Sequence, residues 1–135
     1  MTSPQAISTE SRQLLTDLRN LLLEQHKLLL DRERASYERA NGKVAGPGQL
    51  LTLVLGDPHF AWLKQISTMV VEIDEALAPR SKADQAEAEA LIAKTRELMR
   101  ASEQGTDFQT RYYNAIQESP DIVILQVRIE RLLGI

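Results

Sequence analysis

The chain of 135 residues contains no cysteine, and this absence excludes disulfide bonds, thiolate metal sites and cysteine nucleophiles together. Glycine and proline are also scarce, with six and five residues, which excludes a collagen-like or low-complexity chain. The hydrophobic fraction of 43% is too high for a disordered chain and fits a single globular domain over residues 1–135. A chain without cysteine is compatible with a reducing compartment, and we expect a cytoplasmic protein.

Long apolar runs are absent as well. The longest stretch without a charged side chain is residues 44–56, which contains Gly-Pro-Gly. A spanning helix needs about 18 apolar residues, so we expect no membrane segment. The first residues, MTSPQAISTES, lack a basic region followed by an apolar run, so we expect no secretory signal there.

A surplus of positive charge is also missing, because 16 basic and 19 acidic residues give a net charge of −3. A surface that binds nucleic acid needs several unopposed cations to neutralise phosphates, so the composition disfavours that function. Such a function would have to rest on a short basic stripe with which glutamates interleave. The stripe consists of Arg32, Arg34, Arg39 and Lys43.

Leucines at spacings of three, four and seven predict one long amphipathic helix over residues 8–40. Ser8 is a candidate N-cap, and Ser3 followed by Pro4 would suit an earlier start. Asn41-Gly42 supplies a left-handed stop. A second helical region over residues 49–77 is interrupted at Gly56-Asp57-Pro58, where Asp57 can cap a restart.

A third helix is expected over residues 81–102. A fourth begins at Thr106, whose spacing to Gln109 is that of a capping box, and Ser119-Pro120 interrupts it. The last piece, residues 121–133, alternates like a strand but also carries a helical stripe. We favour a helix because the chain offers no second strand for it to pair with. The sequence therefore predicts an all-α protein, an antiparallel up-down-up-down four-helix bundle with proline breaks in the second and fourth helices.

The densest polar segment lies in the first helix, residues 26–39, and allows two interpretations. Charges three and four residues apart, as between Asp31 and Arg34, are typical of a solvated helix face. The alternative is a polar cluster of His26, Glu33 and Tyr37 that binds a small ligand or a partner helix. Helical bundles often build metal sites with Glu-x-x-His, and the sequence lacks this motif, so we expect no metal or other cofactor. Catalytic motifs such as a nucleophile elbow or P-loop are also missing.

A second candidate segment starts at Asp57, which we expect to cap a helix. Phe60 and Trp62 follow it and point about 200° apart on a helix, so they cannot face the same core. Further along, Asp74 lies seven residues after Ser67, and the two could line a polar strip. We expect an Arg or Lys side chain of the first helix to reach this strip and to form a buried ion pair there.

These two segments resemble a family of small bacterial helical proteins without an assigned activity. The matching blocks read HKLLLDRERASYE over residues 26–38, and DPHFAWLKQIS through VVEIDEAL over residues 57–77. The resemblance covers roughly the first 80 residues, with a loose echo in SPDIV near Ser119. It implies a compact helical bundle and a bacterial cytoplasmic setting, and no catalytic residue or cofactor.

The leading functional prediction is a non-enzymatic interaction or regulatory module with an unidentified protein partner. The alternative is a small-molecule or metal-binding enzyme built around His26, Glu33, Tyr37 and Asp74. We also predict a homodimer, because the C-terminal helix has more apolar residues than one core stripe needs. The surplus residues are Val123, Ile124, Val127, Leu133 and Ile135.

Overall fold

The computed structural model describes residues 5–135, and every regular element in that range is a helix. Apart from one isolated bridge between Ala6 and Asp84, these residues form no β-structure. The predicted all-α class is therefore confirmed. The alternative earlier start of the first helix, at Ser3 and Pro4, lies outside the described residues.

The first helix, α1 (Thr9–Asn41), has 33 residues and begins and ends as predicted. The Ser8 side chain accepts a hydrogen bond from the backbone N–H of Ser11. At the other end Gly42 has a φ of 87°, and its N–H donates to the carbonyl of Glu38. Only glycine adopts this backbone conformation without strain, so the helix stops there.

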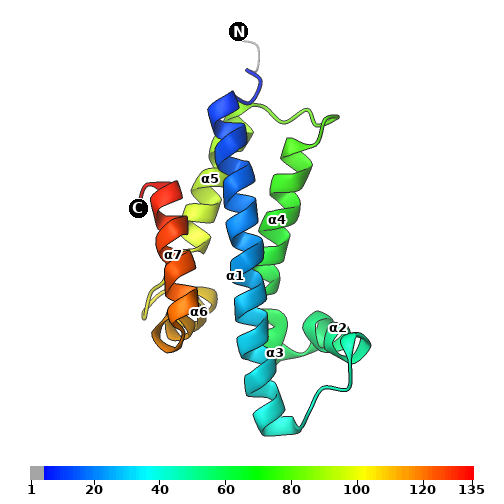
Figure 1. The fold of residues 1–135 in the computed structure, drawn as a ribbon. Helices are drawn as coiled ribbons and strands as arrows, with labels where there is room; N and C mark the ends of the chain where they lie inside the picture. The colour runs from blue at the N-terminus through cyan, green and yellow to red at the C-terminus, as the bar shows by residue number, and fades with distance from the viewer. Residues whose placement is uncertain (1–4) are drawn as a thin grey trace.

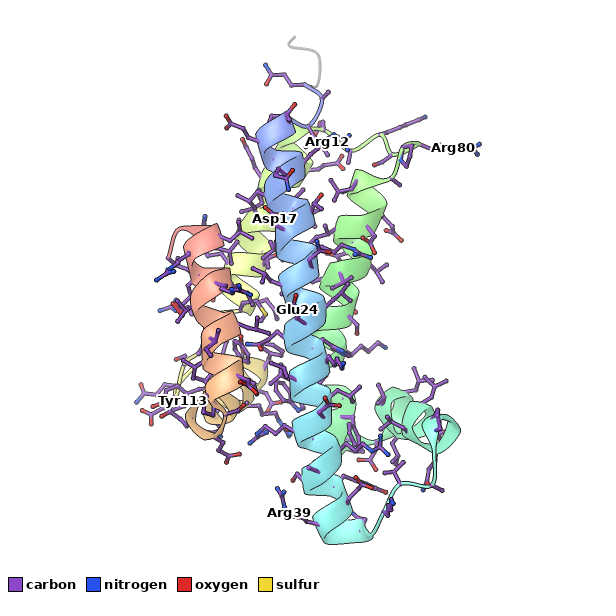
Figure 2. The ribbon with its side chains drawn as sticks, viewed as in Figure 1. Arg12, Asp17, Glu24, Arg39, Arg80 and Tyr113 are labelled. Atoms are coloured by element: carbon purple, nitrogen blue, oxygen red, sulfur yellow. The ribbon has the colours of Figure 1, made fainter. Side chains whose placement is uncertain are left out.

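Three further helices pack against α1: α4 (Lys64–Leu77), α5 (Gln85–Leu98) and α7 (Pro120–Leu133). Figure 1 shows α1 between α4 and α7, with α5 behind. The leucines of α1 form one wall of the core, and isoleucines of α4 and α7 form the others. The fully buried members are Leu15, Leu18, Leu22, Leu29, Ile66, Ile73, Ile122 and Ile129. Outside this core, Asp17 and Glu24 lie on the outward side of α1 (Figure 2).

The break in the second predicted helix is confirmed, because α2 (Pro47–Gly56) and α3 (Pro58–Ala61) precede α4 as separate elements. Asp57 has extended backbone, and its carboxylate accepts from the N–H of His59 at 2.8 Å. The parts before and after the break do not continue in one direction. Because Asp57 changes the chain direction, α2 stands to the side of the other helices and packs mainly on α3 (Figure 1).

The third predicted helix is shorter than residues 81–102, since α5 begins at Gln85. Asp84 caps it by accepting from the N–H of Glu87 at 2.9 Å. The backbone N–H of Gln85 donates to the carbonyl of Gln5 at 2.8 Å, and Asp84 before it has extended backbone. The predicted start at Ser81 is therefore wrong, because Asp84 is an equally suitable cap and the contact of Gln85 with Gln5 favours it.

The last two helices follow the predicted signals more closely. The capping box of Thr106 and Gln109 is present at the start of α6 (Asp107–Glu118), and Ser119 separates α6 from α7. The C-terminal piece is a helix, as we favoured. In Figure 1 α6 turns across the lower end of α7, so these two helices also do not continue in one direction.

One chain of buried polar side chains ties the helices together. The Gln25 side-chain amide donates to the Tyr112 hydroxyl at 2.7 Å and to the carbonyl of Ile122 at 3.0 Å. The Tyr112 hydroxyl donates to Gln126 Oε1, and Gln126 Nε2 donates to the carbonyl of Met99 at 2.9 Å. Burial raises the pKa of Tyr112, which the Gln25 hydrogen bond opposes. The network therefore joins α1, α6, α7 and the end of α5.

Candidate functional site

The polar cluster of the first helix is built where α3 meets α1. Glu33 and Tyr37 are one turn apart on α1 and so lie on one face of it. The Asp57 cap starts α3 with Pro58 at its first position, and this short helix contacts α1. The local sequence signals therefore bring the residues that follow Pro58 to the face of Glu33 and Tyr37.

Glu33 is the charged centre of the cluster and is only 6% exposed. One carboxylate oxygen accepts from the guanidinium of Arg32, and the other lies 3.0 Å from His59 Nε2. Arg32 also donates to Glu118 at 2.6 and 3.0 Å. A buried carboxylate is tolerated only when it is paired. Glu33 meets this requirement through Arg32, and the polar contacts continue from Glu118 of α6 across α1 to His59 of α3.

His59 completes the cluster. Its Nε2 is buried and has no aligned hydrogen bond in the described part of the chain, although Glu33 lies within ion-pair distance. Tyr37 packs against both aromatic rings of α3, with centroids 5.9 Å from His59 and 5.6 Å from Phe60. Protonation of the imidazole would turn the contact with Glu33 into a full ion pair.

A carboxylate beside an imidazole is the chemistry of a general acid–base couple. Catalysis also needs a place for substrate, and neither Glu33 nor His59 lines any of five surface hollows on this chain. Residues 5–135 also contain no group of three or more metal-ligating side chains arranged to hold an ion. The geometry of the couple favours an anchor that holds α3 on α1.

The structure does not bring His26 to this cluster. No hydrogen bond or ion pair within residues 5–135 joins His26 to Glu33 or Tyr37, and His59 takes the place we expected for it. His26 instead lines a hollow of about 290 Å³ together with Leu55 of α2 and residues of α4. Burial lowers the pKa of His26, which favours its neutral form.

The other predicted charged residues of α1 follow the interpretation of a solvated face. Asp31 is exposed and forms no ion pair within the described range. Arg34 pairs with Glu38 one turn along, at 3.5 Å. Arg32 and Arg34, two of the four cations in the basic stripe that nucleic-acid binding would need, both have carboxylate partners.

The predicted residues of the second segment have structural contacts. Asp57 caps α3, as predicted. Phe60 and Trp62 are both buried and face different neighbours, since Phe60 packs on Tyr37 and Trp62 packs on Phe108. The Trp62 indole N–H is buried and has no hydrogen-bond acceptor within residues 5–135.

Asp74 receives an arginine from α1, as predicted, because Arg19 Nε donates to Asp74 Oδ1 at 2.6 Å. The expectation that this pair is buried is wrong. The two side chains are 36% and 46% exposed, since both lie at the outer edge of the contact between α1 and α4. Ser67 takes no part in the strip and donates to the carbonyl of Lys64.

Two features of the site were missed from the sequence. His59 was not among the residues expected in the polar cluster, because its partner Glu33 lies on a different helix. The sequence signal for this contact was the spacing of Glu33 and Tyr37, which places both on one face of α1. That spacing does not indicate which helix packs against the face. The buried network around Tyr112 gave no sequence signal, because glutamines are common on solvated helices.

Two helices expose unusual amounts of apolar side chain. In α2 no residue is buried, and Leu51 and Leu55 are 59% and 76% exposed. In α7 the exposed side chains include Ile124 at 57% and Val127 at 41%. These exposures confirm the predicted apolar surplus of the last helix, except for Leu133, which is buried.

No helix within residues 5–135 combines the length and hydrophobicity that crossing a membrane requires. No family model matches the chain, and neither does any curated protein or solved structure. The resemblance to the bacterial helical family therefore stays a prediction.

Proposed function

We propose that this protein is a non-enzymatic interaction module that binds a helix of a partner protein through α2. The observation that carries the proposal is the exposure of Leu51 and Leu55 on a helix of ten residues that has no charged side chain and buries none. Contiguous exposed apolar surface of this kind is typical of binding sites, because water leaves it favourably when a partner arrives.

The partner that fits this surface is an amphipathic helix with an uncharged contact face. Leu55 and Val71, which is 53% exposed, line the hollow between α2, α4 and α1 together with His26 and Lys64. No carboxylate lines that hollow. An apolar side chain of the partner would therefore enter the hollow, and an acidic residue beside it would suit Lys64.

Crosslinking tests this surface directly. A photo-crosslinking amino acid at position 55 is expected to capture one partner, and mass spectrometry should map the crosslink to an amphipathic helix. The same amino acid at position 23, where Leu23 is 42% exposed on α1 and belongs to neither proposed interface, is the control. The paired change Leu51→Ser with Leu55→Ser should abolish capture of that partner. Crosslinks from position 55 that stay within the chain, or that reach only a second copy, would refute the proposal.

We also propose that the protein forms a homodimer through α7. Its outward face carries Val123, Ile124 and Val127 between exposed charges, with Asp121 in the first turn and arginines in the last two turns. In an antiparallel pairing of two copies, Asp121 approaches the partner's Arg128 while the apolar side chains meet at the centre. The face is thus self-complementary in charge, as a twofold contact requires.

Sedimentation equilibrium at micromolar concentration measures this association. We expect a mass near twice the chain mass of 15.2 kDa. Val127→Glu should return the mass to that of the monomer with helicity retained. Asp121→Arg should weaken the dimer, and combining it with Arg128→Asp should restore it. A mass near that of one chain across the concentration range contradicts the proposal.

We propose in addition that α1, α4, α5 and α7 constitute the predicted antiparallel up-down-up-down four-helix bundle, with α2, α3 and α6 as additions to it. The contacts of α1 with the other three helices support this, as does the alternating chain direction in Figure 1. A bacterial and cytoplasmic setting stays a prediction from the family resemblance. The enzyme alternative also stays a prediction, supported only by the closeness of Glu33 and His59.

A further inference from the structure

The most voluminous of the five hollows lies between α4, α5 and the start of α6, and it shares Lys64 and Thr68 with the hollow beneath α2. Its volume is about 690 Å³, within the range of sites that hold small organic molecules. Side chains from three helices line it, and Ala61 at the end of α3 closes one side. None of the residues that we placed in the Glu33 cluster belongs to this lining.

Its lining is apolar on the inside and polar at the rim. Met69 is 2% exposed and Leu98 is half-buried, so both present hydrocarbon to the hollow. Thr68 and Gln65 lie on the exposed side of α4 and offer hydrogen-bonding groups. An apolar interior with a few polar groups is the usual composition of a small-molecule site.

The charges in the lining leave one cation without a partner. Lys94 is held by Glu72 at 2.9 and 3.0 Å, and Glu97 accepts from the side chain of Gln109. Lys64 forms no ion pair within residues 5–135. An ammonium group beside an apolar surface selects a ligand that carries one negative charge and a hydrocarbon body.

We propose that this hollow binds a small amphipathic carboxylate, with its hydrocarbon part against Met69 and Leu98 and its carboxylate at Lys64. The lining contains no residue of α2 or α7, although Lys64 and Thr68 also line the hollow beneath α2. Trp62 provides a reporter, because it is the chain's one tryptophan. It follows Ala61 of the lining and packs on Phe108, which precedes Gln109 of the lining.

The test titrates the full-length protein with octanoate and follows Trp62 fluorescence, with isothermal calorimetry as a second readout. We expect a saturable change with octanoate and none with acetate, which lacks the hydrocarbon body. Lys64→Gln should weaken octanoate binding about tenfold, the loss of one charge-assisted contact. Lys64→Arg should retain binding. Neutral octanamide should bind the wild-type protein as weakly as octanoate binds the Lys64→Gln variant.

Three further variants locate the site. Gln65→Phe fills the hollow from an exposed position of α4 that is outside the lining of the hollow beneath α2, and it should abolish binding. Lys82→Gln removes an exposed lysine outside the lining and should have no effect. Leu55→Ser alters the neighbouring hollow beneath α2 and should also leave binding unchanged. Loss of binding in Leu55→Ser, equal affinity for octanoate and octanamide, or no saturation up to about 10 mM would each overturn the proposal.

Discussion

Replacing Tyr112 by phenylalanine removes a single oxygen from the centre of the buried network and leaves the ring in place. The side chain is fully buried, so no bulk water replaces the lost hydroxyl. Gln126 Oε1 loses its donor, whereas Gln25 Nε2 keeps the carbonyl of Ile122 as an acceptor. One buried acceptor is thus left unsatisfied, which costs about 1 to 3 kcal/mol of unfolding free energy.

Urea denaturation measures this cost, with an unchanged m-value showing that the unfolding transition is the same. Tyr113→Phe is the matched control, because the adjacent tyrosine is half-exposed and its hydroxyl forms no hydrogen bond within residues 5–135. The control should change stability by less than about 0.5 kcal/mol. If Tyr112→Phe falls within the same limit, the network does not stabilise the fold and the reasoning fails.

Four other outcomes follow from the same contacts. Burial raises the pKa of Tyr112 above its ordinary value of 10.0, so the folded state favours the neutral phenol. The stability that Tyr112 contributes should therefore be lost as pH rises above 10. This loss should be smaller in Tyr112→Phe when unfolding is measured between about pH 9 and 11. Burial lowers the pKa of His26 below 6.5, so the stability it confers is present above pH 6.5 and should fall as pH drops below that value, and His26→Gln should flatten urea midpoints measured between pH 7.5 and 5. Gly42→Ala should lower the free energy of unfolding, measured by thermal denaturation, by about 1 to 2 kcal/mol, because φ at that position is 87°. Backbone strain should be the whole effect, because no atom lies within 4 Å of a new Cβ. A double-mutant cycle on Arg19 and Asp74 should give a coupling below about 1 kcal/mol that weakens with salt, since both side chains are partly exposed.

The helical class could be predicted because its signals are local. Leucine spacing defines α1, and the caps at Ser8, Asp57 and Thr106 satisfy backbone donors within three residues of their own position. Errors arose where two local signals competed. Ser81 and Asp84 both suit an N-cap, and contacts with Gln5, remote in sequence, decide for Asp84.

The direction taken by α2 could not be predicted from its sequence. Its leucines and valine have the pattern of a helix that would be buried, and none of its residues is. A glycine and a proline signal a break at Asp57 but do not give the angle at which the chain continues. That angle depends on what α3 packs against, which is the face of α1 around Tyr37.

Only the α1 part of the candidate site could be predicted from the sequence, because the rest of the site comes from other helices. Periodicity places Glu33 and Tyr37 on one helix face, and a carboxylate on such a face is ordinarily solvated. Contacts from two other helices compensate the burial of Glu33. Glu118 of α6 acts through Arg32, and His59 of α3 contacts Glu33 directly. Such contacts join residues distant in sequence, so no spacing rule reveals them.

The anchor and the exposed helix are consequences of the same break. Asp57 and Pro58 start α3 at the point where His59 and Phe60 meet Tyr37 of α1, and this contact fixes where α3 lies. Because α2 packs mainly on α3, its position depends on that anchor rather than on a core of its own. The Glu33 cluster therefore bears on the proposed function through its position: it holds α3 on α1, and α2 packs on α3 at the edge of the molecule with Leu55 exposed.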